Sequence, residues 1–139
     1  MRVDFHASPR PTVGIEWELA LVDASTGELV SVAEQVLEAI RPDGAESHPR
    51  VHKELLLNTV ELVSGICETV DEACTDLAGA LAEVRAVTDP LGVELFSAGT
   101  HPFARADDQQ ITEGPRYNTL IDRTQWWGRQ MLIYGVHVH

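Results

Sequence analysis

Residues 12–23 read TVGIEWELALVD, and this stretch decides the fold that we expect. Polar and apolar residues alternate along it, which is typical of a β-strand with one face in a core and the other toward water. We therefore predict a strand over residues 12–22. Glu16 and Glu18 share one face of this strand, because side chains two positions apart point the same way. Two steps along a strand span roughly 6.6 Å.

Strands and helices alternate around this stretch. The other expected elements are a returning strand at 29–32, a helix at 33–40, one or two strands with an irregularity within 51–65, a helix at 70–87, a strand at 93–101, a helix at 115–131 and a final strand at 132–139. The strands at 12–22 and 29–32 would form a hairpin. This hairpin and the half-polar strand faces favour an antiparallel or mixed sheet over the parallel sheet that helices between strands would otherwise suggest. We expect the α+β class.

Local signals support the expected helices at 33–40 and 70–87. Ser31 with Glu34, and Thr69 with Glu72, match the capping-box pattern that starts a helix. An apolar stripe at three- and four-residue spacing predicts the buried face of helix 70–87, through Val70, Cys74, Leu77, Leu81 and Val84. Both cysteines, Cys67 and Cys74, are expected to be reduced and partly buried, and Trp126 and Trp127 are expected to be packing residues.

Composition places limits on the partners. The 139 residues are 44% hydrophobic, which suits one domain, with residues 1–11 as a flexible tail. No apolar run is long enough to cross a membrane and no signal peptide is visible, so the cytoplasm is the expected compartment. A net charge of −12 without a basic patch disfavours nucleic acid and anionic membranes. A phosphorylated ligand would need divalent cations between its phosphates and the carboxylates.

Several acidic and imidazole side chains are candidate metal ligands. Glu61 lies in an apolar run and needs a metal, an arginine or hydrogen bonds if it is buried. Glu54 lies seven residues earlier, an odd number, so on a continuous strand it would point to the opposite face from Glu61. It reaches the same site only if a bulge or bend intervenes. His137 and His139 share one face of the last strand, and imidazoles are common metal ligands. A solvated strand face, a salt bridge and ordinary surface histidines remain alternatives for these residues.

Two further stretches are candidate substrate contacts. SAGTHPFA places Thr100 and His101 where a strand turns into a loop, a common position for binding residues. Arg116 and Arg129, in PRYNTL and QWWGRQ, could hold a carboxylate or phosphate. No residue is singled out as the catalytic group.

The order of these motifs resembles the N-terminal part of the carboxylate–amine ligases of the glutamate–cysteine ligase type 2 family, which are more distantly related to glutamine synthetase. The resemblance rests on VGIEWELALVD, ELLLNTVELVSG, SAGTHPFA, RYNTL, QWWGRQM and GVHVH, and covers residues 12–139. It implies a curved, mainly antiparallel sheet with helices on its outer face. It also implies ATP-dependent formation of an amide from glutamate and an amine such as cysteine, through an acyl phosphate, with Mg²⁺ or Mn²⁺.

The resemblance also implies roles for particular residues. Glu16 and Glu18 match the family's metal-binding E-x-E, Glu61 its acidic ligand on the next strand, and His137 the histidine of its G-x-H strand. Glu54 matches an accessory acidic position, and His139 is a further candidate metal ligand. Thr100, His101, Arg116 and Arg129 fall at positions near the substrate.

Family members are more than twice as long as 139 residues. We therefore expect this chain to be a truncated front part of the catalytic domain that folds poorly or associates, possible homo-oligomers included, and lacks ligase activity alone. Two alternatives are a non-catalytic binding or oligomerisation module that keeps the fold, and a metal-dependent hydrolase that uses the H-x-H pair.

Overall fold

The computed structural model describes residues 9–139. The expected tail at 1–11 falls mostly outside these residues, and residues 9–12 form neither helix nor strand. Five strands are present, namely β1 (Ile15–Asp23), β2 (Val51–Lys53), β3 (Thr59–Val63), β4 (Val93–Phe96) and β5 (Val136–Val138). The α-helices are α1 (Ala33–Ile40), α2 (Val70–Thr88), α3 (Pro115–Thr124) and α4 (Trp126–Arg129), with short 3-10 turns at Asp89–Leu91 and Ala106–Asp108.

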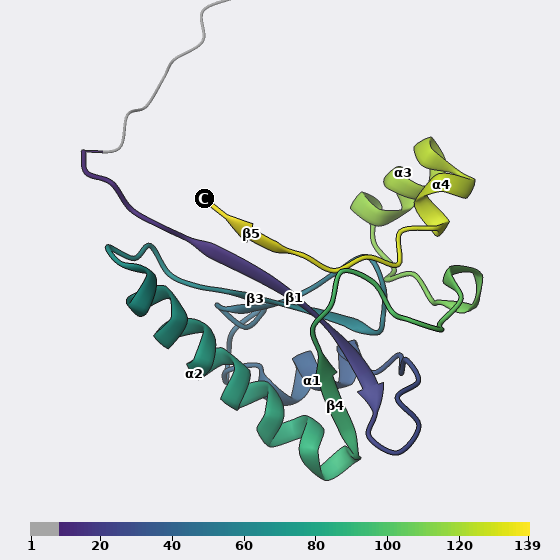
Figure 1. Cartoon of the computed structure of the whole chain (residues 1–139), viewed down its shortest axis with the longest axis horizontal. Helices are drawn as coiled ribbons and strands as arrows, with labels where there is room; N and C mark the ends of the chain where they lie inside the picture. The colour runs from purple at the N-terminus through teal and green to yellow at the C-terminus, as the bar shows by residue number, and fades with distance from the viewer. Residues whose placement is uncertain (1–8) are drawn as a thin grey trace, which may run out of the picture.

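The strands form one open antiparallel sheet with β1 at its centre (Figure 1). β3 pairs with one edge of β1, and β2 lies outside β3. On the other edge, β5 pairs with the first half of β1 and β4 with the second half. The expected α+β class with an antiparallel sheet is confirmed.

One face of the sheet packs against α1 and α2. The apolar side of β1 contributes Leu19 and Leu21, both at most 1% exposed, to this core. The other buried members are Ala33, Val36, Val51, Val60, Leu62, Leu77, Ala80, Val84 and Val93. This larger cluster packs the two helices against the sheet, with Leu19 and Leu21 buried and Ile15 and Trp17 partly buried on the same side of β1.

The opposite face is covered only in part. The second half of β1 places Ala20 and Val22 in a smaller core with α3 and the segment before β5. That core also contains Leu55, Leu56, Tyr117, Ile121, Leu132 and Tyr134. The first half of β1 lies beyond this cover, so Glu16 and Glu18 remain partly exposed. The open half of this face is the place where a site can form.

Helix α2 begins where its capping box predicts. Thr69 is the N-cap, and its hydroxyl oxygen accepts a hydrogen bond from the Glu72 amide at 3.2 Å. The expected apolar stripe is partly wrong, because Val70 is 61% exposed and Cys74 is also exposed. The buried face is instead Ala73, Leu77, Ala80, Val84 and Thr88. Small alanines let this face lie close to the sheet, so Val70 and Cys74 point outward while Leu77 and Val84 stay buried.

Thr69→Ala is expected to destabilise the fold by about 1 kcal/mol, since a free amide at the first turn loses its acceptor. Urea unfolding measures the change. Thr75→Ala is the matched control, because this exposed hydroxyl only donates to the Asp71 carbonyl within the helix. Alanine has the higher helix propensity there, so stability should stay constant or rise. Equal losses in both variants would show that the Thr69 cap contributes nothing special.

Other local expectations are corrected by tertiary contacts. Residues 29–32 form only a single bridge, between Val22 and Leu29, because the chain leaves the sheet to enter α1. The N-cap of α1 is Val32 without a side-chain hydrogen bond, so the expected box at Ser31 does not form. The final strand is limited to β5.

The expected helix at 115–131 is broken into α3 and α4. Gln125 has a φ of +52° at the break. Gly128 then lies so close to Thr124 that a Cβ atom there would overlap it. The sharp return leaves Trp126 and Trp127 58% and 73% exposed, so these expected packing residues contact each other, with ring centroids 4.7 Å apart, while most of their surface stays open. Cys67 is buried and Cys74 exposed, and both are free thiols.

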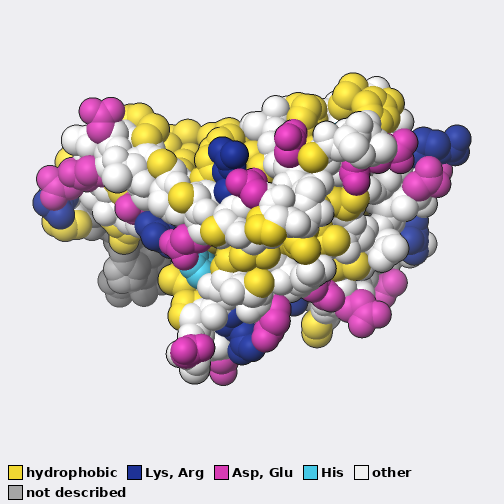
Figure 2. Space-filling view, turned by 90° about the horizontal axis from the view of Figure 1, so that it is seen from below, with side chains coloured by type: hydrophobic (Ala, Val, Ile, Leu, Met, Phe, Trp, Pro, Cys, Tyr) yellow, Lys and Arg dark blue, Asp and Glu magenta, His cyan; other side chains and the backbone are white. Residues whose placement is uncertain are grey.

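The surface charge agrees with the composition. On the face seen in Figure 2, Lys and Arg side chains stand apart among acidic ones, so the described residues there form no continuous basic patch. Among residues 9–139, no helix has the length and apolar character needed to span a membrane.

Candidate metal centre on the open sheet face

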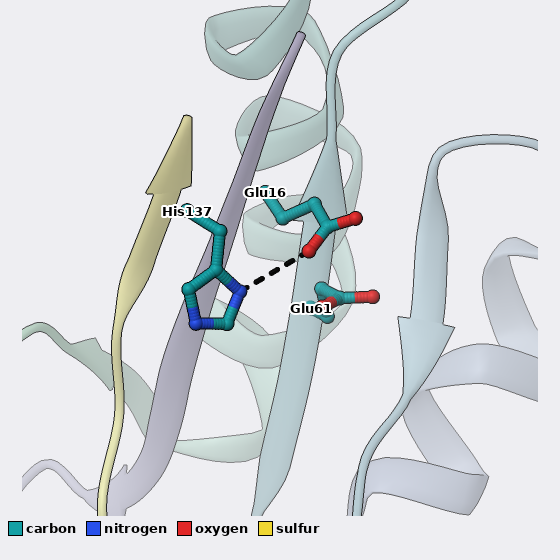
Figure 3. Close-up of side chains that lie close together, drawn as sticks. All are labelled: Glu16, Glu61 and His137. Atoms are coloured by element: carbon teal, nitrogen blue, oxygen red, sulfur yellow. Dashed lines mark hydrogen bonds and ion pairs between the residues drawn. The ribbon is translucent and has the colours of Figure 1, made fainter. Parts of the chain in front are cut away.

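Strand pairing places the acidic and imidazole residues opposite one another. Glu18 on β1 is directly across from Glu61 on β3, and Glu16 is directly across from His137 on β5. Directly paired residues of an antiparallel sheet project from the same face, with Cβ atoms about 5 Å apart. The four side chains therefore meet on the open half of the sheet. Figure 3 shows Glu16, Glu61 and His137 pointing toward one another from three strands.

Glu54 joins this group through a break in the sheet. Residues 54–58 leave the strand geometry between β2 and β3, which removes the parity conflict between Glu54 and Glu61. The expected bend is present. Oxygen atoms of Glu18, Glu54 and Glu61 all lie within 4.8 Å of one another.

A second set of three shares one member with the first. Ligand atoms of Glu16, Glu61 and His137 also lie within 4.8 Å of one another. Glu61 thus belongs to both sets, which we call the inner set (Glu18, Glu54, Glu61) and the outer set (Glu16, Glu61, His137). A carboxylate has two oxygens, so Glu61 has one to offer to each set.

The carboxylates differ in their protein contacts. Glu16 lies between two imidazoles, 3.1 Å from His137 Nδ1 and 3.3 Å from His139 Nε2. Glu18 accepts a hydrogen bond from the Gly135 amide at 2.7 Å. No group of residues 9–139 donates a hydrogen bond to the Glu61 carboxylate. Glu61 is therefore the acidic side chain most in need of an external cation.

Gly135 has a steric role beside this contact. A Cβ atom at this position would lie 3.2 Å from His137 Nε2 and 3.7 Å from Glu18 Oε2. The absence of a side chain lets the backbone approach Glu18 while the imidazole turns toward Glu16. A glycine at the first position of the GVH motif therefore avoids crowding His137 and Glu18.

Burial and mutual repulsion change the protonation of this cluster. Burial raises the pKa of Glu61 to about 7, and the charges of Glu54, Glu16 and Glu18 add to the effect. Burial also raises the pKa of Glu18. The hydrogen bond to His137 lowers the pKa of Glu16, and the same bond raises the pKa of His137. Crowded carboxylates of this kind are stabilised by positive charge.

The donor chemistry favours hard divalent cations. Both sets consist of carboxylate oxygens, with one imidazole nitrogen in the outer set. Oxygen-rich sites suit Mg²⁺ and Mn²⁺, whereas zinc sites usually contain more nitrogen or sulfur. The residues present fit the expected Mg²⁺ or Mn²⁺.

His139 is outside both sets, and within residues 9–139 the ion pair of its imidazole is with Glu16. The outer set thus uses one imidazole of the H-x-H pair rather than two. This arrangement differs from the paired histidine ligands of the hydrolase alternative.

The expected substrate residues lie in different surroundings. Thr100 donates its hydroxyl to the Leu132 carbonyl at 2.6 Å. His101 is 6% exposed between Phe96 and Phe103, with Nε2 2.9 Å from the Gly27 carbonyl oxygen and Nδ1 accepting from the Ala104 amide. Both ring nitrogens of His101 are therefore engaged by the backbone, and the expected substrate contact of this residue stays a prediction.

The two arginines expected near the substrate, Arg116 and Arg129, lie in different places. Arg116, in the first turn of α3, lines a pocket of about 690 Å³ that reaches Glu54 and Glu61. Arg129 lies exposed on α4, outside this pocket. His52, Lys53 and Tyr117 also line the pocket and were missed from the sequence, because only the pairing of β2 and the position of α3 bring them there.

Comparison with known proteins decides the family. The model of glutamate–cysteine ligase family 2 matches residues 12–139. This chain belongs to glutamate–cysteine ligase family 2. It is 59% identical, over 144 aligned residues, to a provisionally named glutamate–cysteine ligase 2-1 of Arthrobacter sp. (strain FB24). It is 58% identical over 138 residues to a provisionally named glutamate–cysteine ligase 2 of Mycobacterium tuberculosis (strain H37Rv).

These family members are much longer. The alignments cover 100% and 99% of this chain, but only 38% and 35% of the two relatives. The chain therefore spans little more than a third of the length of the relatives that it matches.

Solved structures show the same fold at low sequence identity. The glutamate–cysteine ligase of Francisella tularensis, in complex with AMP, superposes with a TM-score of 0.72 at 18% identity, over 91% of this chain and 26% of that one. A bifunctional glutathione synthetase of Pasteurella multocida gives 0.66 at 18% identity, over 91% and 16%. The fold expected from the family resemblance is confirmed.

Proposed function

We propose that this chain forms the cation-binding sheet of an ATP-dependent carboxylate–amine ligase. The observation that carries the proposal is Glu61, a carboxylate without a protein donor that is shared by the inner and outer sets. A polyphosphate has several oxygens that must be neutralised at once, and neighbouring divalent cations do this. The AMP bound by the Francisella ligase and the names of the relatives support ATP, glutamate and cysteine as the substrates.

In the proposed reaction, an oxygen of the glutamate side-chain carboxylate attacks the γ-phosphorus of ATP, and ADP leaves. The amine nitrogen then attacks the acyl phosphate, inorganic phosphate leaves, and the nitrogen loses a proton to give the amide. Bound Mg²⁺ or Mn²⁺ would offset the phosphate charge during transfer. The inner and outer sets would hold the cations, and the Gly135 amide fixes the orientation of Glu18.

We further propose that residues 12–139 are the N-terminal part of the catalytic domain and work in the cytoplasm, where ATP is available. The greater length of the relatives supports the first statement, since the remaining substrate and nucleotide contacts would come from the rest of such a protein. On this view the chain alone binds cations but does not catalyse amide formation.

Two cation positions should be separable by mutation. The unmodified chain is expected to bind two Mn²⁺ ions, and Glu54→Gln and His137→Ala are each expected to lose one, because each residue belongs to a single set. Titration followed by electron paramagnetic resonance counts the free ion. His139→Ala is the matched control, since this imidazole lies outside both sets, and it should retain both ions. A chain that binds one Zn²⁺ through both histidines, and no Mn²⁺, would instead support a hydrolase.

Ligase chemistry can be tested in a chimera. The matching segment of the Arthrobacter relative is replaced by this chain, and phosphate release is measured with ATP, glutamate and cysteine. Turnover comparable to that of the unmodified relative is expected, since 59% of the aligned residues are identical. A folded chimera that binds Mn²⁺ but does not form the amide, beside an active relative, would refute the proposed function.

A further inference from the structure

Glu54 reaches the inner set from a segment that lies outside the strands. β2 ends at Lys53, and residues 54–58 leave the strand geometry before β3 begins. Oxygen atoms of Glu54, Glu18 and Glu61 nevertheless lie within 4.8 Å of one another. A carboxylate on an irregular segment keeps such a position only if contacts from outside the sheet fix its backbone.

The segment after Glu54 is held by the part of the chain that precedes α3. The Leu55 carbonyl accepts a hydrogen bond from the Thr112 amide at 2.8 Å, and the Leu57 amide donates to the Gln110 carbonyl at 2.9 Å. The Leu55 amide donates to the Glu54 carboxylate itself at 3.1 Å. These bonds fix the backbone on the C-terminal side of Glu54.

The segment before Glu54 is held by one side chain of α3. The Tyr117 hydroxyl donates a hydrogen bond to the Lys53 carbonyl at 2.9 Å. That carbonyl and the Glu54 amide belong to one planar peptide unit, so a contact that fixes the carbonyl also fixes the direction in which Glu54 leaves β2. Tyr117 is 6% exposed. Burial raises the pKa of its hydroxyl, and the nearby charges of Glu54 and Glu61 add to the effect.

We propose that Tyr117 is a positioning residue for the inner set, which acts through its hydrogen bond to the Lys53 carbonyl on the orientation of Glu54. The hydroxyl proton is engaged by the backbone, so Tyr117 works through Glu54 and does not itself bind the cation. The proposal rests on the proposed function, because the inner set has to bind a cation. It is specific to one set, since the outer set does not contain Glu54.

Tyr134 provides a matched control within the same core. Both tyrosines belong to the smaller core, and both are 6% exposed. The Tyr134 hydroxyl is buried and has no hydrogen-bond partner among residues 9–139. Replacement by Phe keeps the ring in both cases, so the two substitutions differ in whether a hydrogen bond to the backbone is lost.

The test measures Mn²⁺ affinity in two backgrounds that each leave one set intact. In His137→Ala, which keeps the inner set, Tyr117→Phe is expected to weaken Mn²⁺ binding about tenfold, as the loss of an outer contact to a metal ligand typically does. Tyr134→Phe should leave this affinity unchanged. In Glu54→Gln, which keeps the outer set, Tyr117→Phe should also have no effect. Electron paramagnetic resonance measures the free ion, and circular dichroism confirms that each variant is folded.

The outcomes separate the two proposals. If the unmodified chain binds Mn²⁺ and Tyr117→Phe leaves the affinity of the inner set unchanged, the positioning role alone is overturned. An equal loss in both backgrounds, an equal loss after Tyr134→Phe, or loss of the folded state would also overturn it, because the hydroxyl would then support the fold in general. An unmodified chain that binds no Mn²⁺ would overturn the proposed function itself, and with it this role.

Discussion

Glu61→Gln is expected to remove the Mn²⁺-dependent stabilisation of this chain. Glu61 is the one member common to the inner and outer sets, so its loss weakens both cation positions together. A free cation at about a hundred times its dissociation constant stabilises a fold by about 2.7 kcal/mol per site. In the unmodified chain, Mn²⁺ should therefore raise the melting temperature by several degrees, and in Glu61→Gln it should raise it little.

The same variant should behave in the opposite way without cations. In the fold the pKa of Glu61 is about 7, above its ordinary value of 4.5. Below pH 4.5 this group is protonated in both folded and unfolded states, so its charge costs nothing. As the pH rises from 4.5 to 7, Glu61 ionises freely in the unfolded state but still holds its proton in the folded state, so stability falls until both states are ionised. Glu61→Gln removes this loss, so with EDTA it should be more stable than the unmodified chain at pH 8 and equal to it near pH 4.

Thermal melts with Mn²⁺ or EDTA measure both effects. Glu28→Gln is the control, because Glu28 is exposed near the β1 turn and belongs to neither set. It should keep the full Mn²⁺ response and show no gain at pH 8. If Glu61→Gln retained the response of the unmodified chain, the shared-carboxylate arrangement would be wrong.

Cation affinity is expected to fall steeply below pH 7. Glu61, with a pKa of about 7, must lose its proton before it can bind a cation, and His137, whose pKa is raised above 6.5 by Glu16, must also be neutral. Glu16 stays ionised because the same contact lowers its pKa. One competing proton weakens binding about tenfold per pH unit, and two weaken it up to about a hundredfold. Affinity should level off above the two pKa values.

Mn²⁺ titrations between pH 5.5 and 8.5 check this dependence. His137→Ala should reduce the steepness, since only the Glu61 proton then competes in this range. His139→Ala should leave the profile near that of the unmodified chain. An affinity that stays constant from pH 8.5 to 5.5 would argue against Glu61 and His137 as ligands.

Local sequence patterns were sufficient for the elements that short-range physics controls. Alternation in GIEWEL put Glu16 and Glu18 on one strand face, and the Thr69 box located the start of α2, because side-chain direction and capping depend on neighbouring residues. The opposite parity of Glu54 and Glu61 required a bend, and residues 54–58 provide it. The family resemblance supplied the purpose of these residues rather than their arrangement.

Local patterns failed where distant segments compete. Val70 and Cys74 of the expected α2 stripe face outward because Ala73 and Ala80 fit the sheet more closely, and the burial of His101 comes from its contacts with Phe96, Phe103 and the Gly27 carbonyl. Both outcomes depend on contacts between residues far apart in the chain. Spacing along the sequence carries no information about those contacts.

By itself, the sequence determined the α+β class, the strand that carries Glu16 and Glu18, and the residue types suited to hard cations. Only the tertiary structure decided that Glu18 pairs with Glu61, that Glu16 pairs with His137, and that one carboxylate serves both sets. The physical reason is strand register. A shift of one residue turns every side chain to the opposite face, and register is set by the packing of the whole sheet against its helices.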